Sequence, residues 1–369
     1  MQATRSGNAT LELRVGDLVE VLGQAEILAT LDENGELDAL PFMPEMLAYC
    51  GRRLTVDKVA HKTCDTLTSS GIRRMANAVH LTGVRCGGEA HGGCQAACLI
   101  YWKHAWLRKV DPDSDPGQPG AQQAMTAPQA TTAPQATMAP QATMAPQATT
   151  APQAADDRRL LPLLTISAQR PPAADGEQVW RCQATELLRA APQQLPLKNL
   201  GQFAEDIRTG NVGIFWTARA ILVATYNRMQ GLGKRFLPPS WRFRGGLHWG
   251  FLRGTAEKTP TVRSDLRPGD AVRIKSKKEV APTLNPQLLN RGMGFDAEMG
   301  RHCGKTARVA RRVDQIIDER TGRMIRMKNP CIVLEGVICE GAFNLNCPRS
   351  ITPYWREVWL EKIEENPTE

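Results

Sequence analysis

The sequence predicts a mainly β protein with some α-helix, in which two small, related β-barrels flank a helical middle segment. Three features support this prediction: a similarity between the two ends of the chain, a low-complexity tract after the first copy, and helical apolar spacing in the middle. The expected domains are a cysteine-rich barrel over residues 1–112, a disordered linker over 113–156, a helical segment over 157–260 and a second cysteine-rich barrel over 261–369.

The two ends of the chain match without a gap at a constant separation of 253 residues. The clearest matches are VGDLVEV (15–21) with PGDAVRI (268–274), HLTGVRC (80–86) with VLEGVIC (333–339), and YWKHAWLRKV (101–110) with YWREVWLEKI (354–363). A gapless match of this length is not expected by chance. We therefore interpret the two ends as copies of one ancestral domain.

Between the copies, the pentapeptide APQAT recurs from about residue 127 to 154. Its residues cannot form a core, and each proline removes a backbone donor, so the tract is expected to be an extended, disordered linker. In the middle segment that follows, residues 184–191 and 211–230 have the apolar spacing of helices, whereas 234–251 carry the Pro, Gly and Trp pattern of irregular structure.

Each copy opens with G-D-x-V-x-[VI], whose apolar residues alternate as in a strand. A short helix-compatible stretch follows at 25–31 and 278–284. In the second copy, 308–318 and 326–338 flank the turn sequence DERTGR, which predicts a β-hairpin. Several short strands in so short a domain fit an SH3-like β-barrel, and the GDxVxV opening resembles the first strand of many such barrels.

Charge and hydropathy disfavour several classes of partner. The net charge of +8 is spread along the chain, and no run of interleaved basic and aromatic residues stands out, which disfavours nucleic acid. The N-terminus lacks the apolar region of a signal peptide, and the longest apolar run (212–226) is short and interrupted by Arg219, so no membrane span is expected. A cytoplasmic location follows, where the ten cysteines favour metal ligation or redox chemistry over disulfides.

Three cysteines are common to both copies and predict a metal site in each. Cys50, Cys86 and Cys94 match Cys303, Cys339 and Cys347. A tetrahedral site or a cubane needs a fourth ligand. Cys331 is the only further cysteine in the second copy, and its match is Ala78. If the hairpin of the first copy brings Cys64 beside Ala78, Cys64 takes the corresponding place.

The predicted ligand sets are therefore Cys50, Cys64, Cys86, Cys94 and Cys303, Cys331, Cys339, Cys347. His91 or Cys98 is the alternative fourth ligand in the first set, and His302 in the second. The tight C-x2-C pairs typical of structural zinc are absent from the sequence. The sequence thus favours two iron–sulfur clusters per chain, of the 4Fe–4S type among others, over zinc.

Cys98, Cys182 and His91 have no matching cysteine or histidine, since Ile351 and Asn344 stand at the positions that correspond to Cys98 and His91. A duplicated structural site has no reason to diverge, whereas a working site does. These three residues are therefore predicted to form the catalytic or ligand-binding region; simple core packing of Cys98 and Cys182 is the alternative. Glu45 and its match Glu298 are expected to cap or salt-bridge a turn, with a role as a base as the alternative.

The phrases LPFMPEMLAYCG, VRCGGEAHGGCQAAC, CQATEL and PYWREVWLEKI resemble a group of uncharacterised, cysteine-rich bacterial proteins with a duplicated domain, some encoded beside biosynthetic genes. The resemblance covers nearly the whole chain except the linker and implies no particular activity. The predicted function is an iron–sulfur enzyme that performs redox or sulfur-transfer chemistry on a small molecule. The alternative is a zinc-stabilised pair of SH3-like barrels that acts as a binding or adaptor protein.

Overall fold

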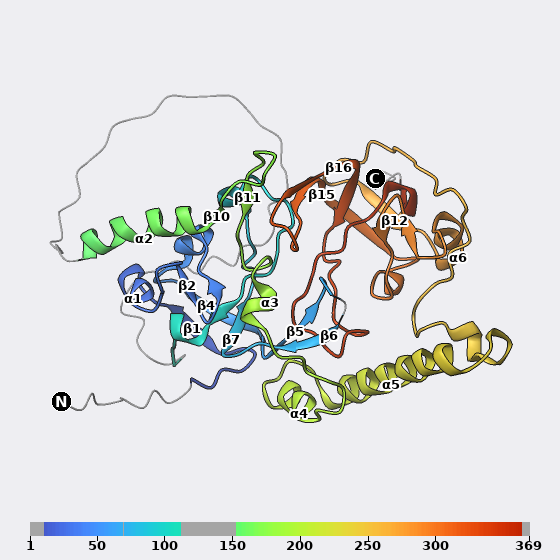
Figure 1. Ribbon diagram of the computed structural model, residues 1–369, viewed down its shortest axis with the longest axis horizontal. Helices are drawn as coiled ribbons and strands as arrows, with labels where there is room; N and C mark the ends of the chain where they lie inside the picture. Colours follow the sequence, from blue (N-terminus) through green and yellow to red (C-terminus); the bar gives the residue numbers. More distant parts are fainter. Residues whose placement is uncertain (1–10, 69, 112–152, 364–369) are drawn as a thin grey trace, which may run out of the picture.

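A computed structural model describes residues 11–68, 70–111 and 153–363. In this part of the chain the protein is mixed α and β, with mostly strands in antiparallel sheets (Figure 1). The predicted linker over 113–156 lies almost wholly outside the described residues. We refer to residues 11–111 as the first half and to residues 261–363 as the second half.

The first half is built on a five-stranded antiparallel sheet in the order β8-β7-β4-β1-β9. Its strands are β1 (Leu18–Val21), β4 (Arg53–Val59), β7 (Ala78–Leu81), β8 (Trp102–Lys103) and β9 (Leu107–Lys109). Two further pairs complete it, β2 (Glu36–Leu37) with β3 (Leu40–Pro41) and β5 (Lys62–Asp65) with β6 (Gly71–Arg74). The helix α1 (Gln24–Leu28) and the 3-10 turns η1 (Pro44–Tyr49), η2 (Glu89–His91) and η3 (His104–Trp106) connect the strands.

The second half has a four-stranded sheet in the order β16-β15-β12-β17. Its strands are β12 (Ala271–Ile274), β15 (Thr306–Ile317), β16 (Met324–Leu334) and β17 (Leu360–Lys362), with β13 (Leu289–Asn290) and β14 (Met293–Gly294) as a separate pair. The helix α6 (Lys277–Val280) and the 3-10 turns η6 (Ala281–Thr283), η7 (Met299–Arg301) and η8 (Glu357–Trp359) lie between them. The long β15–β16 hairpin confirms the predicted turn at 318–323.

When residues of the two halves are matched as in the sequence comparison, their strands pair in the same register. In the first half Val19 pairs with Leu54 and Lys109, and in the second half Val272, 253 residues later, pairs with Ala307 and Lys362. The register also shifts at matching places, between Val56 and Lys58 and between Val309 and Arg311. The two halves therefore share the register of these strands and one irregularity.

Both cores are organised by two buried tryptophans packed edge-on against one phenylalanine. The ring of Phe42 lies 6.1 and 5.1 Å from those of Trp102 and Trp106, and Phe295 lies 6.1 and 5.2 Å from the matching tryptophans Trp355 and Trp359. A buried indole N–H needs an acceptor. The threonine hydroxyl groups of Thr30 and Thr283 supply it to Trp106 and Trp359, at 3.0 and 2.9 Å respectively.

The middle segment is largely helical, as predicted, but it also contains a short strand pair. Its elements are α2 (Gln153–Ser167), β10 (Gln169–Arg170), β11 (Val179–Trp180), α3 (Leu187–Ala190), α4 (Gly201–Arg208), α5 (Ile214–Phe236), and the 3-10 turns η4 (Pro239–Trp241) and η5 (Phe243–Gly246). Both α3 and α5 lie on the predicted helical stretches, but α5 continues to Phe236, into the segment that was expected to be irregular. Among the described residues, no helix combines the length and the apolar character needed to span a membrane.

The halves meet through two reciprocal contacts between a strand amide of one half and a cysteine sulfur of the other. The N–H of Cys64 donates to Cys347 Sγ at 3.0 Å, and the N–H of Ile317 donates to Cys94 Sγ at 3.3 Å. Ile317 matches Cys64, and Cys347 matches Cys94. Matching residues also face each other, because Thr66 donates to the Glu319 carboxylate at 2.7 Å. Each half thus packs the loop that carries this cysteine, Cys94 or Cys347, against a strand of the other half. The arrangement is approximately two-fold.

Helix α4 is attached to the first half by a fully buried ion pair. Lys62 Nζ lies 2.6 Å from Asp206 Oδ2, and neither side chain is exposed to solvent. Burial raises the pKa of Asp206 to about 6 although Lys62 opposes the shift. Such a pair contributes little net stability compared with apolar packing, but removing one partner leaves an uncompensated buried charge.

Asp206→Asn is therefore expected to lower the free energy of unfolding by about 3–5 kcal/mol. Glu205→Gln, which removes an exposed partner of Arg208 on the same helix, is the matched control and should cost no more than about 0.5 kcal/mol. Urea unfolding followed by tryptophan fluorescence measures both. Equal losses would contradict the role assigned to the buried pair.

Candidate metal centre

A cavity of about 330 Å³ lies where the two halves and the middle segment meet. Residues 96–101 of the first half, 182–184 of the middle segment, and 316–319 and 351–354 of the second half contribute to its walls. Four thiols and one imidazole line it: Cys86, Cys94, Cys98, Cys182 and His91. The three residues predicted to be catalytic thus lie on one cavity, together with two of the repeated cysteines.

The reciprocal contacts between the halves build the walls of this cavity. Cys94 and Ile317, which share one of these hydrogen bonds, both line it. Arg349 lines it as well; its guanidinium donates to Thr66 Oγ1 at 2.9 Å and pairs with the Glu319 carboxylate at 2.6 Å. The cavity therefore exists only when the two halves are docked.

Glycines allow the loop RCGGEAHGGC to fold back on itself. Gly88 has φ +77°, and a Cβ placed there would lie only 1.8 Å from the carbonyl oxygen of Cys94. Gly92 has φ +63°, and a Cβ there would lie 2.6 Å from the ring of Trp180. Both positions require glycine because of the backbone conformation and the lack of space. The fold of this loop brings His91 back towards Cys86.

Glu45, Cys86 and His91 form a compact group of potential ligands. His91 Nδ1 lies 2.8 Å from Glu45 Oε1, and the Cys86 thiol donates to the same oxygen at 3.8 Å. The ligand atoms of all three lie within 4.8 Å of one another, and among the residues the structure describes this is the one such group of three or more. His91 Nε2 and Glu45 Oε2 are buried without a hydrogen-bond partner. Unpaired buried polar atoms are costly, so these two atoms are suited to bind a ligand.

His91 also lowers the pKa of the Glu45 carboxyl group. Burial alone would raise the pKa of Glu45, but the hydrogen bond and the charge of His91 outweigh it, so that the pKa lies below its usual value. Glu45 is therefore a carboxylate near neutral pH. It comes from η1, where the sequence favoured a turn-capping role; the contact with His91 is what that prediction missed.

In the second half, structural contacts occupy the place that corresponds to the Glu45–Cys86–His91 group. Glu298 accepts the N–H of Phe343 at 2.8 Å and lies 3.3 Å from the guanidinium of Arg301. Asn344 stands where the first half has His91. The carboxylate is thus neutralised by an arginine and used for packing. The comparison shows that the first half alone has the Glu–Cys–His group.

Burial raises the pKa values of three cavity thiols, those of Cys86, Cys98 and Cys182. The pKa of Cys98 is raised to about 11 and that of Cys182 to about 12, while that of Cys86 lies far above its usual value. Negative charge on Glu45 and on neighbouring thiols adds to the effect for Cys86. Without a cation, these groups are protonated at neutral pH. A raised pKa disfavours Cys86 as an activated nucleophile, whereas a bound metal cation would offset the repulsion and stabilise the thiolates.

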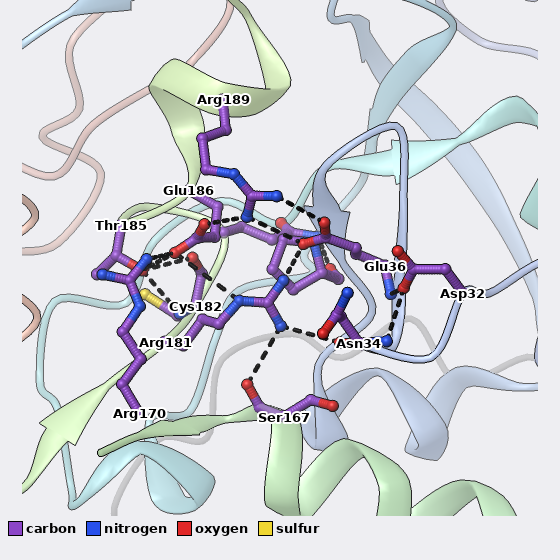
Figure 2. A network of polar contacts seen from close by, with 12 residues as sticks. Asp32, Asn34, Glu36, Ser167, Arg170, Arg181, Cys182, Thr185, Glu186 and Arg189 are labelled. Carbon is purple, nitrogen blue, oxygen red and sulfur yellow. Dashed lines mark hydrogen bonds and ion pairs between the residues drawn. The ribbon is translucent and has the colours of Figure 1, made fainter. Parts of the chain in front are cut away.

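A buried ionic network fixes the segment that carries Cys182 (Figure 2). Arg181 pairs with Glu36 of the first half, and Arg189 bridges Glu36 at 2.8 Å and Glu186 at 2.5 Å. Glu186 is fully buried, so its charge requires these partners. The network attaches residues 181–189 to the first half and thereby positions Cys182.

Two local contacts refine that position. The hydroxyl of Thr185 accepts the N–H of Cys182 at 3.0 Å. The buried amide of Gln183 accepts the N–H of Tyr101 at 2.8 Å and donates to the carbonyl groups of Tyr101 and Pro41 at 2.9 and 3.0 Å. The side-chain amide of Gln183 is thus fully hydrogen-bonded, and it holds the neighbouring Cys182 beside residues 98–101.

The predicted fourth ligands need correction. Cys64 is opposite Ile72 in the β5–β6 pair, whereas Ala78 is opposite Lys103 in the β7–β8 pair. The expectation that Cys64 lies beside Ala78, and so takes the place of Cys331, is therefore wrong. Cys64 contacts Cys347 of the other half instead.

The remaining cysteines of the predicted sets are dispersed over the structure. Cys331 is buried opposite Val313, with its thiol 3.8 Å from Met293 Sδ and 3.4 Å from the Arg356 guanidinium. Cys50 and Cys303 pack at the margins of the two cores. Within the described residues, neither four-cysteine set forms a group of ligand atoms within 4.8 Å, and His302, the alternative ligand of the second set, joins no such group.

Comparison with known proteins adds no assignment. No family model, no curated protein and no solved structure has significant similarity to this chain. The function is therefore inferred from the geometry of the cavity and from the chemistry of its side chains.

Replacing Gly88 with alanine tests the loop geometry. Gly88→Ala should lower the free energy of unfolding by about 3 kcal/mol or more, because a backbone clash is added to an unfavourable φ. Gly51→Ala has a similar φ of +72° but no atom within 4 Å of the new Cβ, and should cost about 1 kcal/mol. Urea unfolding compares the two; a smaller loss for Gly88→Ala would argue against the folded-back loop.

Proposed function

We propose that this protein is a cytoplasmic metalloprotein with one thiolate-ligated metal centre, an iron–sulfur cluster, in the cavity between its halves. The centre would serve redox or sulfur-transfer chemistry on a small molecule. The observation that supports this most strongly is the convergence of Cys86, Cys94, Cys98 and Cys182 on a single cavity. Two of these thiols have no counterpart in the second half, so one centre per chain replaces the two expected from the sequence.

The spacing of the thiols favours a cluster over a single ion. Ligand sulfur atoms lie about 2.3 Å from zinc, so four of them around one ion are within about 4 Å of each other. The four cavity thiols form no such group among the described residues. A cluster contains several metal and sulfide atoms, and it can therefore join thiolates that are distributed around a larger space.

Cys86, Cys98 and Cys182 are the proposed ligands of the cluster, with Cys94 as the fourth. The other side chains of the cavity suit a reaction on a small molecule. The carboxylate of Glu45 orients His91, which would hold or transfer a proton beside the substrate. Arg349 and Tyr354 of the second half also line the cavity and would offer donors to a polar substrate. A cavity of about 330 Å³ is in the usual range for small-molecule sites.

Zinc is the second candidate, and the compact Glu45–Cys86–His91 group favours it. Three protein ligands with one open position are typical of catalytic zinc. In that case the thiols of Cys98 and Cys182 would line the site without binding the ion. A zinc-stabilised tandem of SH3-like barrels that acts as a binding protein remains the corresponding non-enzymatic proposal.

We also propose that the halves are copies of one SH3-like barrel and that the site evolved in the first copy. The shared strand registers and the matched Phe–Trp–Trp cores support common ancestry. Glu298, Cys339 and Asn344 then mark the place where the second copy has a structural arrangement instead.

Anaerobic purification followed by metal and sulfide analysis tests the centre. The protein should be brown and contain iron and sulfide, and Cys98→Ser and Cys182→Ser should each lose most of both. Cys339→Ser, the match of Cys86, is the control and should retain them. Colourless protein with zinc that is lost in Glu45→Gln but kept in Cys182→Ser would overturn the cluster and support the second candidate.

Metal binding should release protons. Because the pKa values of Cys98 and Cys182 are about 11 and 12 and that of Cys86 is higher still, all three thiols are protonated in metal-free protein at pH 8. Ligation requires these thiols to lose their protons, so the cluster should bind more tightly as the pH rises. Reconstitution of metal-free protein with Fe²⁺ and sulfide at a series of pH values, followed by iron and sulfide analysis after desalting, measures this. Uptake of iron and sulfide that is independent of pH would contradict ligation by these thiols.

A further inference from the structure

The long helix α5 has one buried side of mixed character and an exposed apolar side. Thr217, Ala220, Val223 and Gln230 form its buried side. On the other side, Phe215, Leu222, Met229 and Phe236 follow one another at seven-residue intervals, and they are 74, 64, 66 and 70% exposed. Seven residues are two turns of an α-helix, so these four side chains form one continuous stripe. In Figure 1, α5 lies along the lower edge of the molecule.

The segment after α5 extends the exposed apolar surface. Trp241 and Phe243 follow in η4 and η5, and they are 75 and 68% exposed. Trp249 is 42% exposed and packs edge-on against Tyr226 of α5. A contiguous apolar surface of this kind is unusual for a chain without a partner at that place.

The same segment is strongly basic. Residues 209–256 contain no Asp or Glu but seven cationic residues: Arg219, Arg228, Lys234, Arg235, Arg242, Arg244 and Arg253. The whole chain has a net charge of only +8, so the expectation that charge is spread evenly along it is wrong for this region. Helical spacing places Arg228 and Arg235 about a quarter turn from the stripe. Both are exposed, and among the described residues no ion pair joins either of them to a carboxylate.

We propose that α5 and the segment to residue 253 form a docking surface for an anionic lipid membrane, with the helix lying in the membrane interface. A helix with exposed Phe, Leu and Met on one face and cations beside them suits this position, since the apolar side chains enter the acyl region and the cations reach lipid phosphates. Exposed tryptophans are also typical of that interface.

Charge and side-chain type favour this occupant over two others. A second copy of the chain would bring an equally basic stripe against this one, which is repulsive. Nucleic acid suits the cations and aromatic rings, but the aliphatic side chains of Leu222, Met229 and Leu232 offer it no stacking surface. The proposal is independent of the metal centre.

Co-sedimentation of the full-length protein with vesicles tests the proposal. Binding is expected to vesicles of phosphatidylglycerol and phosphatidylcholine in equal parts, to weaken with added salt, and to be absent with phosphatidylcholine alone. Leu222→Gln with Met229→Gln, both at exposed positions, should weaken binding roughly tenfold or more. Ile166→Gln changes a side chain on α2 that is 74% exposed and should leave binding unchanged.

Three results would overturn the proposal. The first is no sedimentation of the wild-type chain with the anionic vesicles, and the second is equal binding by the double variant. The third is a dimer in light scattering that the double variant dissociates, which would assign the stripe to a second copy. Arg228→Gln with Arg235→Gln should weaken vesicle binding. If the wild-type chain does not bind vesicles and this double variant loses binding to an oligonucleotide, the surface belongs to nucleic acid.

Discussion

The reciprocal docking of the halves is the contact on which the other features of this structure depend. Each half offers a cysteine sulfur to a strand amide of the other, in the pairs Cys347 with Cys64 and Cys94 with Ile317. A sulfur atom is a weak acceptor, so each bond alone contributes little. Their importance is geometric, because together they fix the distance and orientation of two separately folded cores and leave a cavity between them.

The docking contacts of the two halves are approximately symmetric, but the side chains that each half places beside them differ. Two equivalent docking contacts create equivalent surroundings, and each half then differs in what it places there. The first half supplies Glu45 and His91 around Cys86, whereas the second half neutralises Glu298 with Arg301. The middle segment breaks the symmetry further, because it contributes Cys182 to the cavity and anchors it by a buried ionic network. Two halves with matching strand registers can therefore enclose one asymmetric cavity.

The sequence predicted those features that depend on local pattern and on internal comparison. Alternation in GDxVxV located the first strand of each half, and the DERTGR turn located the long hairpin. The absence of repeated counterparts selected Cys98, Cys182 and His91, which line one cavity. The pairing of Cys64 was not predictable, because it depends on the register of β5–β6 and on a contact with Cys347, which is 283 residues away in sequence.

The central claim is that thiolates from two distant segments hold a polynuclear centre in this cavity. X-ray absorption spectroscopy at the metal edge tests it most directly, because it reports both the ligand atoms and any second metal nearby. The account predicts iron with a shell of sulfur ligands and a clear iron–iron distance, which Cys98→Ser and Cys182→Ser would abolish. A zinc ion with nitrogen, oxygen and a single sulfur ligand, and no neighbouring metal, would contradict it.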